Sequence, residues 1–151
     1  MPPKRGSLLP EEDHVVRNIR WTKLIKDENE NVIGIFPEAF ELRDKDNGRL
    51  SVSWLEHFAG DKKTQLRETK NALATGWKGG KLPPRGALGI GNVAKIKLAG
   101  KKIKPPLRIV YAPSKTNPAH SSIVNMPSDD KVLLETLAAD VFTEFVQVKD
   151  I

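Results

Sequence analysis

The clearest chemistry in this sequence lies in a basic span, residues 69–128, that contains no aspartate or glutamate. Eleven of the 25 lysines and arginines lie in this span, and all 19 acidic residues lie outside it. The basic residues are Lys70, Lys78, Lys81, Arg85, Lys95, Lys97, Lys101, Lys102, Lys104, Arg108 and Lys115. Such a charge distribution predicts an anionic partner and says little about the fold.

Nine of these cations are the candidate nucleic-acid or anion-binding residues, and we expect them to lie on one side of the molecule. They are Lys78, Lys81, Arg85, Lys95, Lys97, Lys101, Lys102, Lys104 and Arg108. A continuous patch of this kind suits a phosphate backbone, where displaced counterions make the affinity salt-dependent. Trp77 and Tyr111 are the only aromatic residues in the span, which offers little for stacking on single strands. Nucleic acid is therefore favoured over an acidic protein as the partner, and the alternative is a solvated lysine face without a ligand.

A second set of residues can support acid–base chemistry on a phosphate-bearing substrate. His14, Arg17, Glu56 and His120 are the candidate catalytic residues if the protein is an enzyme. Brought together, beside Ser51 for example, they supply an acid, a base and a phosphate clamp. Each also has an ordinary structural interpretation as a hydrogen-bonded or exposed side chain. The three histidines lack the spacing of metal-ligand motifs, so the sequence predicts no metal site and no cofactor.

Residues 86–91, G-A-L-G-I-G, resemble a phosphate cradle in composition. They match neither the P-loop nor the dinucleotide-binding motif, and the segment after them is expected to be a strand where both motifs need a helix. We therefore favour a connector within a long basic loop, rich in glycine and proline, at residues 76–92.

Length and composition predict a single domain. A chain of 151 residues buries roughly 70% of the surface that its unfolded form exposes. The absence of cysteine excludes disulfides and suits a reducing cytoplasm. Neither a signal peptide nor an apolar run of membrane-spanning length is present, so we expect a cytoplasmic protein without membrane contact. We predict a disordered or extended tail at residues 1–10 and one domain at 11–151, with the oligomeric state open.

Hydrophobic patterning predicts several β-strands. They are expected within residues 11–21, 32–36, 50–54, 94–98, 107–111 and 120–126. In the strand at 94–98, Lys95 and Lys97 would form a cationic face, and a basic turn would join this strand to 107–111 as a hairpin. Residues 44–48 read as a tight turn because Asn-Gly tolerates positive φ.

Two helices and one short helical start complete the expected fold. Asp61 is predicted to cap a polar helix over residues 61–75, and an amphipathic helix is predicted over 128–141. The S-x-x-E spacing of Ser53 and Glu56 predicts a capping box directly after a strand. The expected fold class is α+β: a small, mainly antiparallel sheet with a polar middle helix and an amphipathic C-terminal helix packed against it.

Three segments carry a resemblance to a known group of proteins. They are Ala39–Arg43 (A-F-E-L-R), Leu50–Glu56 (L-S-V-S-W-L-E) and Asn117–His120 (N-P-A-H). In this order they resemble a family of small, uncharacterised bacterial proteins. The resemblance implies a bacterial origin and a place in a defence or mobile-element gene set, and it implies no catalytic residue. The basic segment at 76–106 falls outside it.

Three functions follow from these observations. The leading one is a non-enzymatic binding or accessory protein that contacts an anionic partner through the basic span. The second is an enzyme or toxin that acts on nucleic acid or nucleotides through the His/Arg/Glu set. The third is a structural subunit of a protein complex.

Overall fold

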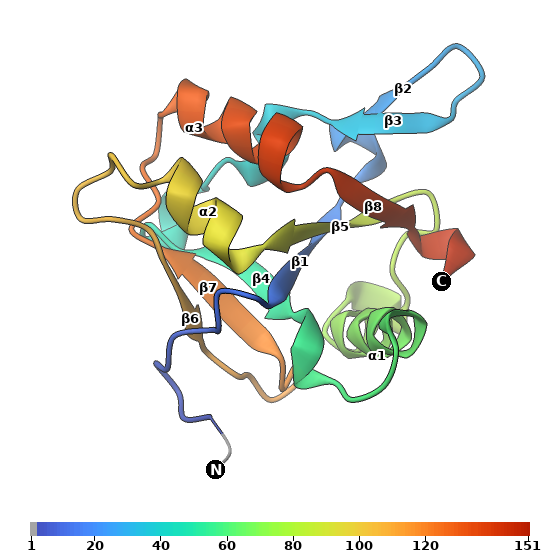
Figure 1. The fold of residues 1–151 in the computed structure, drawn as a ribbon. Coiled ribbons are helices and arrows are strands. Elements are labelled where there is room, and N and C mark those ends of the chain that lie inside the picture. The colour runs from blue at the N-terminus through green and yellow to red at the C-terminus, as the bar shows by residue number, and fades with distance from the viewer. Residues whose placement is uncertain (1–2) are drawn as a thin grey trace.

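A six-stranded antiparallel sheet forms the body of the molecule within residues 3–151, which this computed structural model describes (Figure 1). Its strands follow the order β6-β7-β4-β1-β5-β8. They are β1 (His14–Ile19), β4 (Leu50–Trp54), β5 (Ala87–Asn92), β6 (Arg108–Tyr111), β7 (His120–Val124) and β8 (Glu144–Gln147). A separate hairpin of β2 (Leu24–Lys26) and β3 (Val32–Ile35) projects from this body. The predicted α+β fold with a mainly antiparallel sheet is confirmed.

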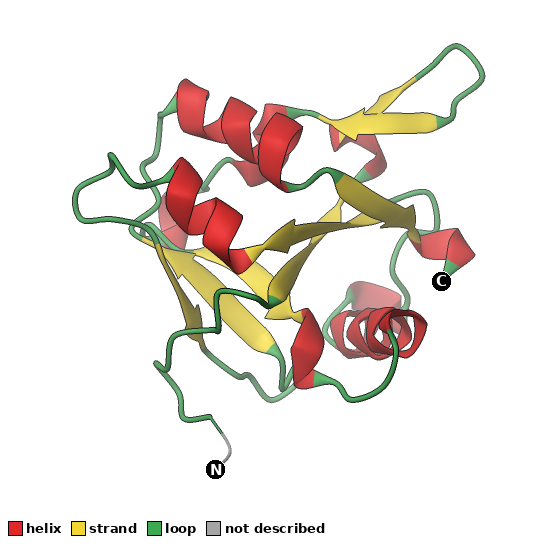
Figure 2. Ribbon diagram, in the orientation of Figure 1, coloured by secondary structure: helices red, strands yellow, loops and turns green. Residues whose placement is uncertain are grey.

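Helices cover both faces of the sheet (Figure 2). α2 (Val93–Ala99) and α3 (Lys131–Thr136), which continues as a π-helical turn at Leu137–Val141, lie on one face, and α1 (Lys62–Thr75) lies on the other. Short 3₁₀ turns occupy Trp21–Lys23, Pro37–Phe40, Asp44–Asp46, Leu55–His57, Lys78–Gly80 and Val148–Asp150. No helix within residues 3–151 has the length and apolar character needed to cross a membrane.

Successive side chains of β1 point to opposite faces of the sheet and pack into two different hydrophobic cores. Val15 faces the larger core under α2 and α3, where the ring of Phe142 lies against Phe40 with centroids 4.7 Å apart. Val16 points to the opposite face and joins a smaller core with Leu66 of α1. β1 is therefore buried on both faces, as a central strand should be.

The polar middle helix begins where its cap predicts. The carboxylate of Asp61 accepts a hydrogen bond from the backbone N–H of Thr64 at 2.8 Å, which satisfies one donor of the first turn. Leu66 and Thr69 are its buried residues. Lys70 donates to the carbonyl oxygens of Val148 and Ile151 and so ties α1 to the end of the chain.

The predicted loop at residues 76–92 is wrong for its last part, because β5 begins at Ala87 and pairs with both β1 and β8. The prediction took the glycines in this segment as a sign of a flexible loop. In the structure they allow other side chains to pack closely against β5. A Cβ at Gly91 would stand 2.9 Å from the ring of Phe142, and one at Gly89 would stand 3.2 Å from Ile35. These residues are small because other side chains press on the strand.

The predicted strand at residues 94–98 is also wrong, because α2 occupies this segment. The side chain of Asn92 caps the helix by accepting a hydrogen bond from the N–H of Lys95 at 3.1 Å. Val93 and Ile96 are buried at helical spacing, whereas Leu98 is 64% exposed. Lys95 therefore does not share a flat strand face with its neighbours.

The expected hairpin between residues 94–98 and 107–111 is replaced by a β6–β7 pairing. β6 is an edge strand, and residues 3–10 run beside it: Leu8 forms a bridge with Val110, and the N–H of Leu9 donates to Ile109. Residues 1–2 lie outside the described part of the chain.

The capping box predicted from Ser53 and Glu56 does not form. Ser53 is buried within β4, and its hydroxyl accepts a hydrogen bond from the side-chain amide of Asn117 at 2.9 Å. Glu56 lies in the turn Leu55–His57 and binds His14. Both side chains therefore form hydrogen bonds with residues distant in the chain and do not cap a helix.

The amphipathic C-terminal helix is confirmed. Asp130 caps α3 by accepting from the N–H of Leu133, and Leu133, Leu134 and Leu137 are buried. The sequence patterns did not predict β8, which follows this helix and forms the second edge of the sheet.

Candidate functional site

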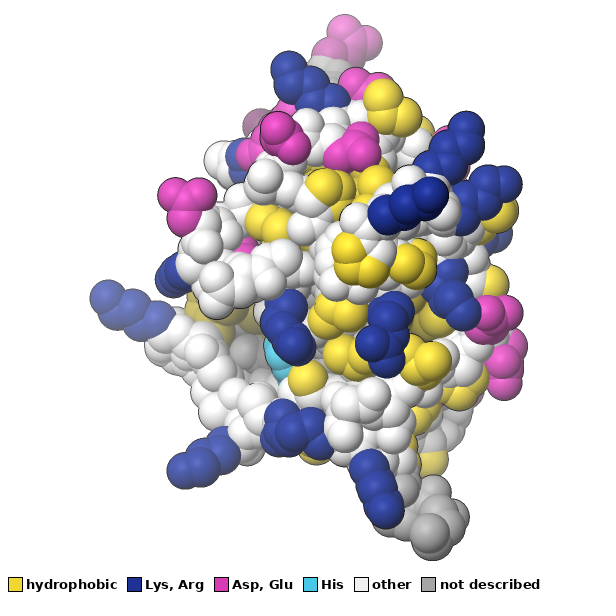
Figure 3. Space-filling view, turned by 90° about the vertical axis from the view of Figure 1, so that its left-hand side faces the viewer, with side chains coloured by type: hydrophobic (Ala, Val, Ile, Leu, Met, Phe, Trp, Pro, Cys, Tyr) yellow, Lys and Arg dark blue, Asp and Glu magenta, His cyan; other side chains and the backbone are white. Residues whose placement is uncertain are grey.

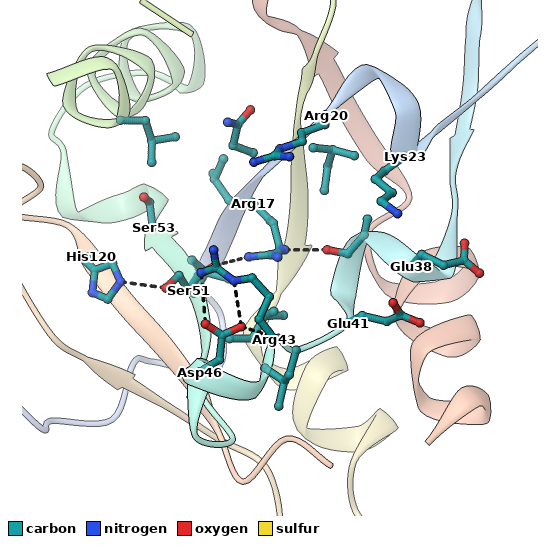
Figure 4. A pocket seen from close by; sticks show the side chains of 18 of the residues that line it. Arg17, Arg20, Lys23, Glu38, Glu41, Arg43, Asp46, Ser51, Ser53 and His120 are labelled. Carbon is teal, nitrogen blue, oxygen red and sulfur yellow. Dashed lines mark hydrogen bonds and ion pairs between the residues drawn. The ribbon is translucent and has the colours of Figure 1, made fainter. Parts of the chain in front are cut away.

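The two central strands β1 and β4 pair over a short distance and then separate. Val15 faces Trp54 and Val16 faces Ser53, and the ladder stops there. Arg17 fills the gap: its Nε donates to the carbonyl of Ala39 at 2.9 Å, and one of its terminal nitrogens donates to the carbonyl of Ser51 at 2.8 Å (Figure 4). A guanidinium thus occupies the place of the missing rungs between the strands.

A cavity of about 450 Å³ opens at this separation, and we call it the β1–β4 cavity. It is lined by Val16, Arg17, Asn18, Ile19, Arg20, Lys23, Glu38, Ala39, Glu41, Leu42, Arg43, Asp46, Leu50, Ser51, Val52, Ser53, Leu73, Trp77 and His120. Its walls come from β1, β4, β7, α1 and the short turns after β3. Cavities of roughly 300–1,000 Å³ hold small ligands in other proteins.

Arg17 carries a partly dehydrated positive charge into the cavity. Burial lowers the pKa of its guanidinium to about 10, the attraction of Asp46 opposes this shift, and the repulsion of Arg43 adds to it. The group stays charged at neutral pH. Its hydrogen-bond acceptors are carbonyl oxygens, and the ion pairs found within residues 3–151 do not include Arg17.

Asp46 does not neutralise Arg17, because Arg43 holds its carboxylate. The backbone N–H of Arg43 donates to Asp46 at 2.6 Å, and its guanidinium donates at 3.1 Å. These hydrogen bonds lower the pKa of Asp46. The Arg43–Asp46 pair is therefore internally compensated and leaves the charge of Arg17 unmatched.

Further charges stand around the cavity (Figure 4). Arg20 is exposed and Lys23 is half-buried, and both follow β1. Glu38 and Glu41 are exposed and belong to the segment after β3. The cavity consequently has a cationic wall along β1 and a carboxylate-bearing rim at the residue 37–41 segment.

A serine and a histidine meet at the other side of the same cavity. His120 Nε2 lies 3.3 Å from the hydroxyl of Ser51, and His120 Nδ1 lies 2.7 Å from the carbonyl oxygen of Ala112. A carbonyl can only accept, so Nδ1 carries the proton and the neutral ring presents Nε2 as an acceptor. Ser51 therefore donates to His120.

The four candidate catalytic residues separate into two places. Arg17 and His120 line the β1–β4 cavity, and both bind Ser51. His14 and Glu56 form a pair of their own: the carboxylate accepts from the backbone N–H of His14 at 2.7 Å and lies 2.6 Å from Nδ1. This pair does not line the cavity, and it fixes the start of β1 to the turn after β4.

The candidate anion-binding cations lie in two groups separated by the length of β5 (Figure 1). Lys78, Lys81 and Arg85 precede β5, whereas Lys95, Lys97, Lys101, Lys102, Lys104 and Arg108 follow it. A strand of six residues spans roughly 20 Å. The cations therefore belong to two groups at opposite ends of β5, and their convergence on one side of the molecule stays a prediction.

Two of these cations already have partners. Arg85 lies over the ring of Trp21, 3.9 Å from its centroid, and approaches Glu30 to 3.5 Å. Lys97 pairs with Glu11 at 2.6 Å. Figure 3 looks onto the side where α2 lies in Figure 1 and shows lysine and arginine spread over that face, with carboxylates confined to its upper half and right edge.

Sequence reasoning missed Arg20, Lys23 and Arg43 as site residues. It also named Ser51 only as a neighbour of the histidines. Apolar and polar residues alternate over residues 50–54, which places Ser51 on the exposed face of its strand. This pattern was the sequence signal by which Ser51 could have been identified as a site residue. Nothing in the sequence indicates that β1 and β4 separate.

Comparison with family models, with curated proteins and with solved structures finds no match to this chain. The resemblance to small bacterial proteins therefore stays a prediction. The three segments that carry it, residues 39–43, 50–56 and 117–120, all contribute side chains to the β1–β4 cavity.

Proposed function

We propose that the protein binds a phosphate-bearing ligand of nucleotide size in the β1–β4 cavity. The observation that carries this proposal is the half-buried, charged guanidinium of Arg17, which has carbonyl partners and no carboxylate. A buried charge is stabilised when a counter-charge reaches it. Arginine presents planar N–H groups that suit phosphate oxygens, and two bonds to carbonyls leave its other N–H groups free for a ligand.

The remaining lining residues favour a nucleotide over a bare anion. Trp77 and Leu73 provide an apolar wall on the α1 side, and Asn18 provides an amide. Aromatic rings stack on bases, and amides pair with base edges. Arg20 and Lys23 can meet additional phosphates near the solvent. The combination supplies a contact for each chemical part of a nucleoside phosphate.

Thermal unfolding in the presence of nucleosides and their phosphates tests this proposal. A ligand at 100 times its dissociation constant adds about 2.7 kcal/mol to the free energy of unfolding, which should raise Tm by roughly 5–10 °C for a domain of this size. We expect this shift with nucleoside mono- or triphosphates and not with the nucleoside alone. Inorganic phosphate separates recognition of the phosphate from recognition of the whole nucleotide.

An unchanged Tm with inorganic phosphate and with every nucleoside phosphate at millimolar concentration would contradict the proposal. It would leave Arg17 as a structural bridge between β1 and β4.

A second function, contact with a nucleic-acid backbone, is favoured by a different feature. We call Lys95, Lys101, Lys102, Lys104 and Arg108 the α2 basic surface. All five are exposed, and no ion pair within residues 3–151 involves them. Lysines without carboxylate partners can neutralise phosphates along a backbone. On the resemblance to bacterial proteins, such a partner would belong to a defence or mobile-element system.

Charge reversal on the α2 basic surface tests this second function. The triple variant Lys101→Glu, Lys102→Glu, Lys104→Glu should weaken binding to a random-sequence DNA duplex at least tenfold at low salt. The slope of log affinity against log salt should fall by about 2–3, because each lost phosphate contact removes roughly 0.9. Fluorescence anisotropy at two salt concentrations measures both quantities.

The matched control reverses three exposed cations on α1 and in the turn Val148–Asp150, away from α2 (Figure 1): Lys63→Glu, Arg67→Glu, Lys149→Glu. It changes the net charge equally and should have a much smaller effect. Equal losses in the two triple variants would show that net charge governs the binding, and would remove the α2 basic surface as a specific site.

A further inference from the structure

We propose that Ser51 is a nucleophile for phosphoryl transfer and that His120 is its general base. This inference rests on the proposed function, because it assigns a reaction to the phosphate-bearing ligand of the β1–β4 cavity. It joins two features of one cavity: a hydroxyl that faces an oriented imidazole, and a guanidinium beside the same serine.

The nucleophile and the base have the relation that serine chemistry needs. Ser51 is exposed on β4, and its hydroxyl lies 3.3 Å from His120 Nε2. Such contacts are often longer without substrate than in the reacting complex. The carbonyl of Ala112, 2.7 Å from Nδ1, holds the ring in the tautomer whose Nε2 accepts a proton.

The sheet fixes this pair from both sides. β4 and β7 are antiparallel, with Ser51 opposite Ser122 and Ser53 opposite His120. Ser51 and His120 are therefore diagonal neighbours on one face of two hydrogen-bonded strands. Side chains on paired strands are held more accurately than side chains on loops.

The other serines nearby do not offer the same chemistry. Ser53 lines the cavity, but it is buried and its hydroxyl accepts from Asn117. Ser122 is also buried. Ser51 thus combines exposure with a histidine acceptor.

Arg17 places the anion beside this hydroxyl. Its guanidinium binds the carbonyl of Ser51, so a phosphate on its free N–H groups lies next to the residue that carries the nucleophile. Figure 4 shows Arg17 on one side of Ser51 and His120 on the other. Positive charge at this position stabilises the charge that develops on phosphoryl oxygens.

The reaction balances with water as the second substrate. Ser51 Oγ attacks phosphorus, the Oγ–P bond forms, and the bond from phosphorus to the leaving oxygen breaks with its electron pair on that oxygen. The hydroxyl proton moves to His120 Nε2 and then to the leaving oxygen. Water next attacks the phosphoserine and gives its proton to Nε2. Inorganic phosphate leaves, and the proton returns to Ser51 Oγ.

A fluorophosphonate reagent tests the first step directly, because it forms the same Oγ–P bond and releases fluoride. We expect a single adduct, located at Ser51 by mass spectrometry of peptides. Ser51→Ala should lose it, and His120→Asn should slow its formation on the order of 10²–10⁴-fold. His14→Asn is the matched control, because that histidine lies outside the cavity, and its rate should stay within about twofold of the wild type. Absence of an adduct at Ser51, or equal labelling of the exposed Ser128, overturns the proposal.

A second measurement uses the absence of cysteine from the chain. In Ser51→Cys the new thiol is unique, and His120 should accelerate its alkylation by iodoacetamide at neutral pH at least tenfold relative to Ser128→Cys. Adding His120→Asn should remove the acceleration, and equal rates at the two positions overturn the proposal. Neither reagent needs the natural ligand, so the result is independent of the nucleotide-induced Tm shift. A Tm shift without Ser51 reactivity leaves a binding protein, and reactivity without a Tm shift removes the nucleotide and keeps the nucleophile.

Discussion

Replacing Arg17 with leucine is expected to abolish the stabilisation by nucleoside phosphates and to leave the fold intact. The bound phosphate would lose charge-assisted hydrogen bonds that contribute about 1.5–3 kcal/mol each. The dissociation constant should therefore rise on the order of 100-fold. Calorimetric titration of wild type and Arg17→Leu with the same nucleotide measures the difference.

The fold should survive because Arg17 is itself poorly solvated. Burial lowers its pKa from the ordinary value of an arginine to about 10, so the charged form, although it still prevails at pH 7, is less stable in the folded protein than in the unfolded chain. Between these two pKa values the unfolded chain binds more protons, so stability rises with pH there, and the penalty is fully present at pH 7. Leucine removes this penalty together with the hydrogen bonds to Ala39 and Ser51. These opposing effects should keep the free energy of unfolding within about 2 kcal/mol of the wild type.

Two further variants control this experiment. Arg49→Leu removes an exposed arginine that does not line the β1–β4 cavity, and it should bind the nucleotide normally. Arg17→Lys keeps the charge but loses the planar fork, so its affinity should be intermediate. Nucleotide binding by Arg17→Leu with wild-type affinity would contradict the assignment of the anion to Arg17.

The largest loss of stability is expected from Phe142→Ala. The ring is 1% exposed, lies against Phe40 and covers Gly91, where the strand has no side chain of its own. Its removal leaves a cavity between the sheet and the π-helical turn, which should lower the free energy of unfolding by about 3–5 kcal/mol. Tm should fall by roughly 10 °C or more, and urea unfolding with an unchanged m-value would measure the effect.

Phe36→Ala is the matched control for the same truncation. Phe36 is 41% exposed, so its loss should lower the free energy of unfolding by less than about 1.5 kcal/mol. Similar effects of the two variants would show that the Phe142 site collapses around the smaller side chain, and that the glycines of β5 do not depend on this ring.

Sequence patterns predicted those elements whose signals are local. Asp61 starts α1 because its carboxylate reaches the N–H of Thr64, three residues away. Residues 50–54 show the alternation of a strand with one face in a core, and the helix near the C-terminus shows helical spacing. These signals depend on neighbours in the chain and can be read without the fold.

Two segments were assigned wrongly because contacts from distant residues decide them. Glycine-rich residues 87–92 form a central strand, since Phe142 and Ile35 supply the side chains that the strand lacks. Residues 93–99 alternate between apolar and basic side chains, yet Asn92 caps them as a helix. A pattern this short fits both the two-residue repeat of a strand and the 3.6-residue repeat of a helix. Val93 and Ile96 are both buried, and this spacing agrees with the helix.

The site was harder to predict than the fold. His120 was a candidate, and Ser51 was named beside it, but they lie 69 positions apart in the chain and only the β4–β7 register brings them together. The early end of the β1–β4 ladder has no sequence signal at all. The charge distribution can be read from the sequence, and it indicated the α2 basic surface. It gave no indication of the β1–β4 cavity.

The strand order also has a consequence for the route by which the chain folds. Among the neighbouring pairs of the sheet β6-β7-β4-β1-β5-β8, only β6 and β7 are consecutive along the chain. β1 pairs with β5, and β4 pairs with β7, only after a long intervening segment has been brought back to the sheet. Closing these loops costs conformational entropy before the strand pairing can offset it. Folding should accordingly be slow for a chain of this length, and a ribosome must synthesise most of the chain before either central strand gains both neighbours.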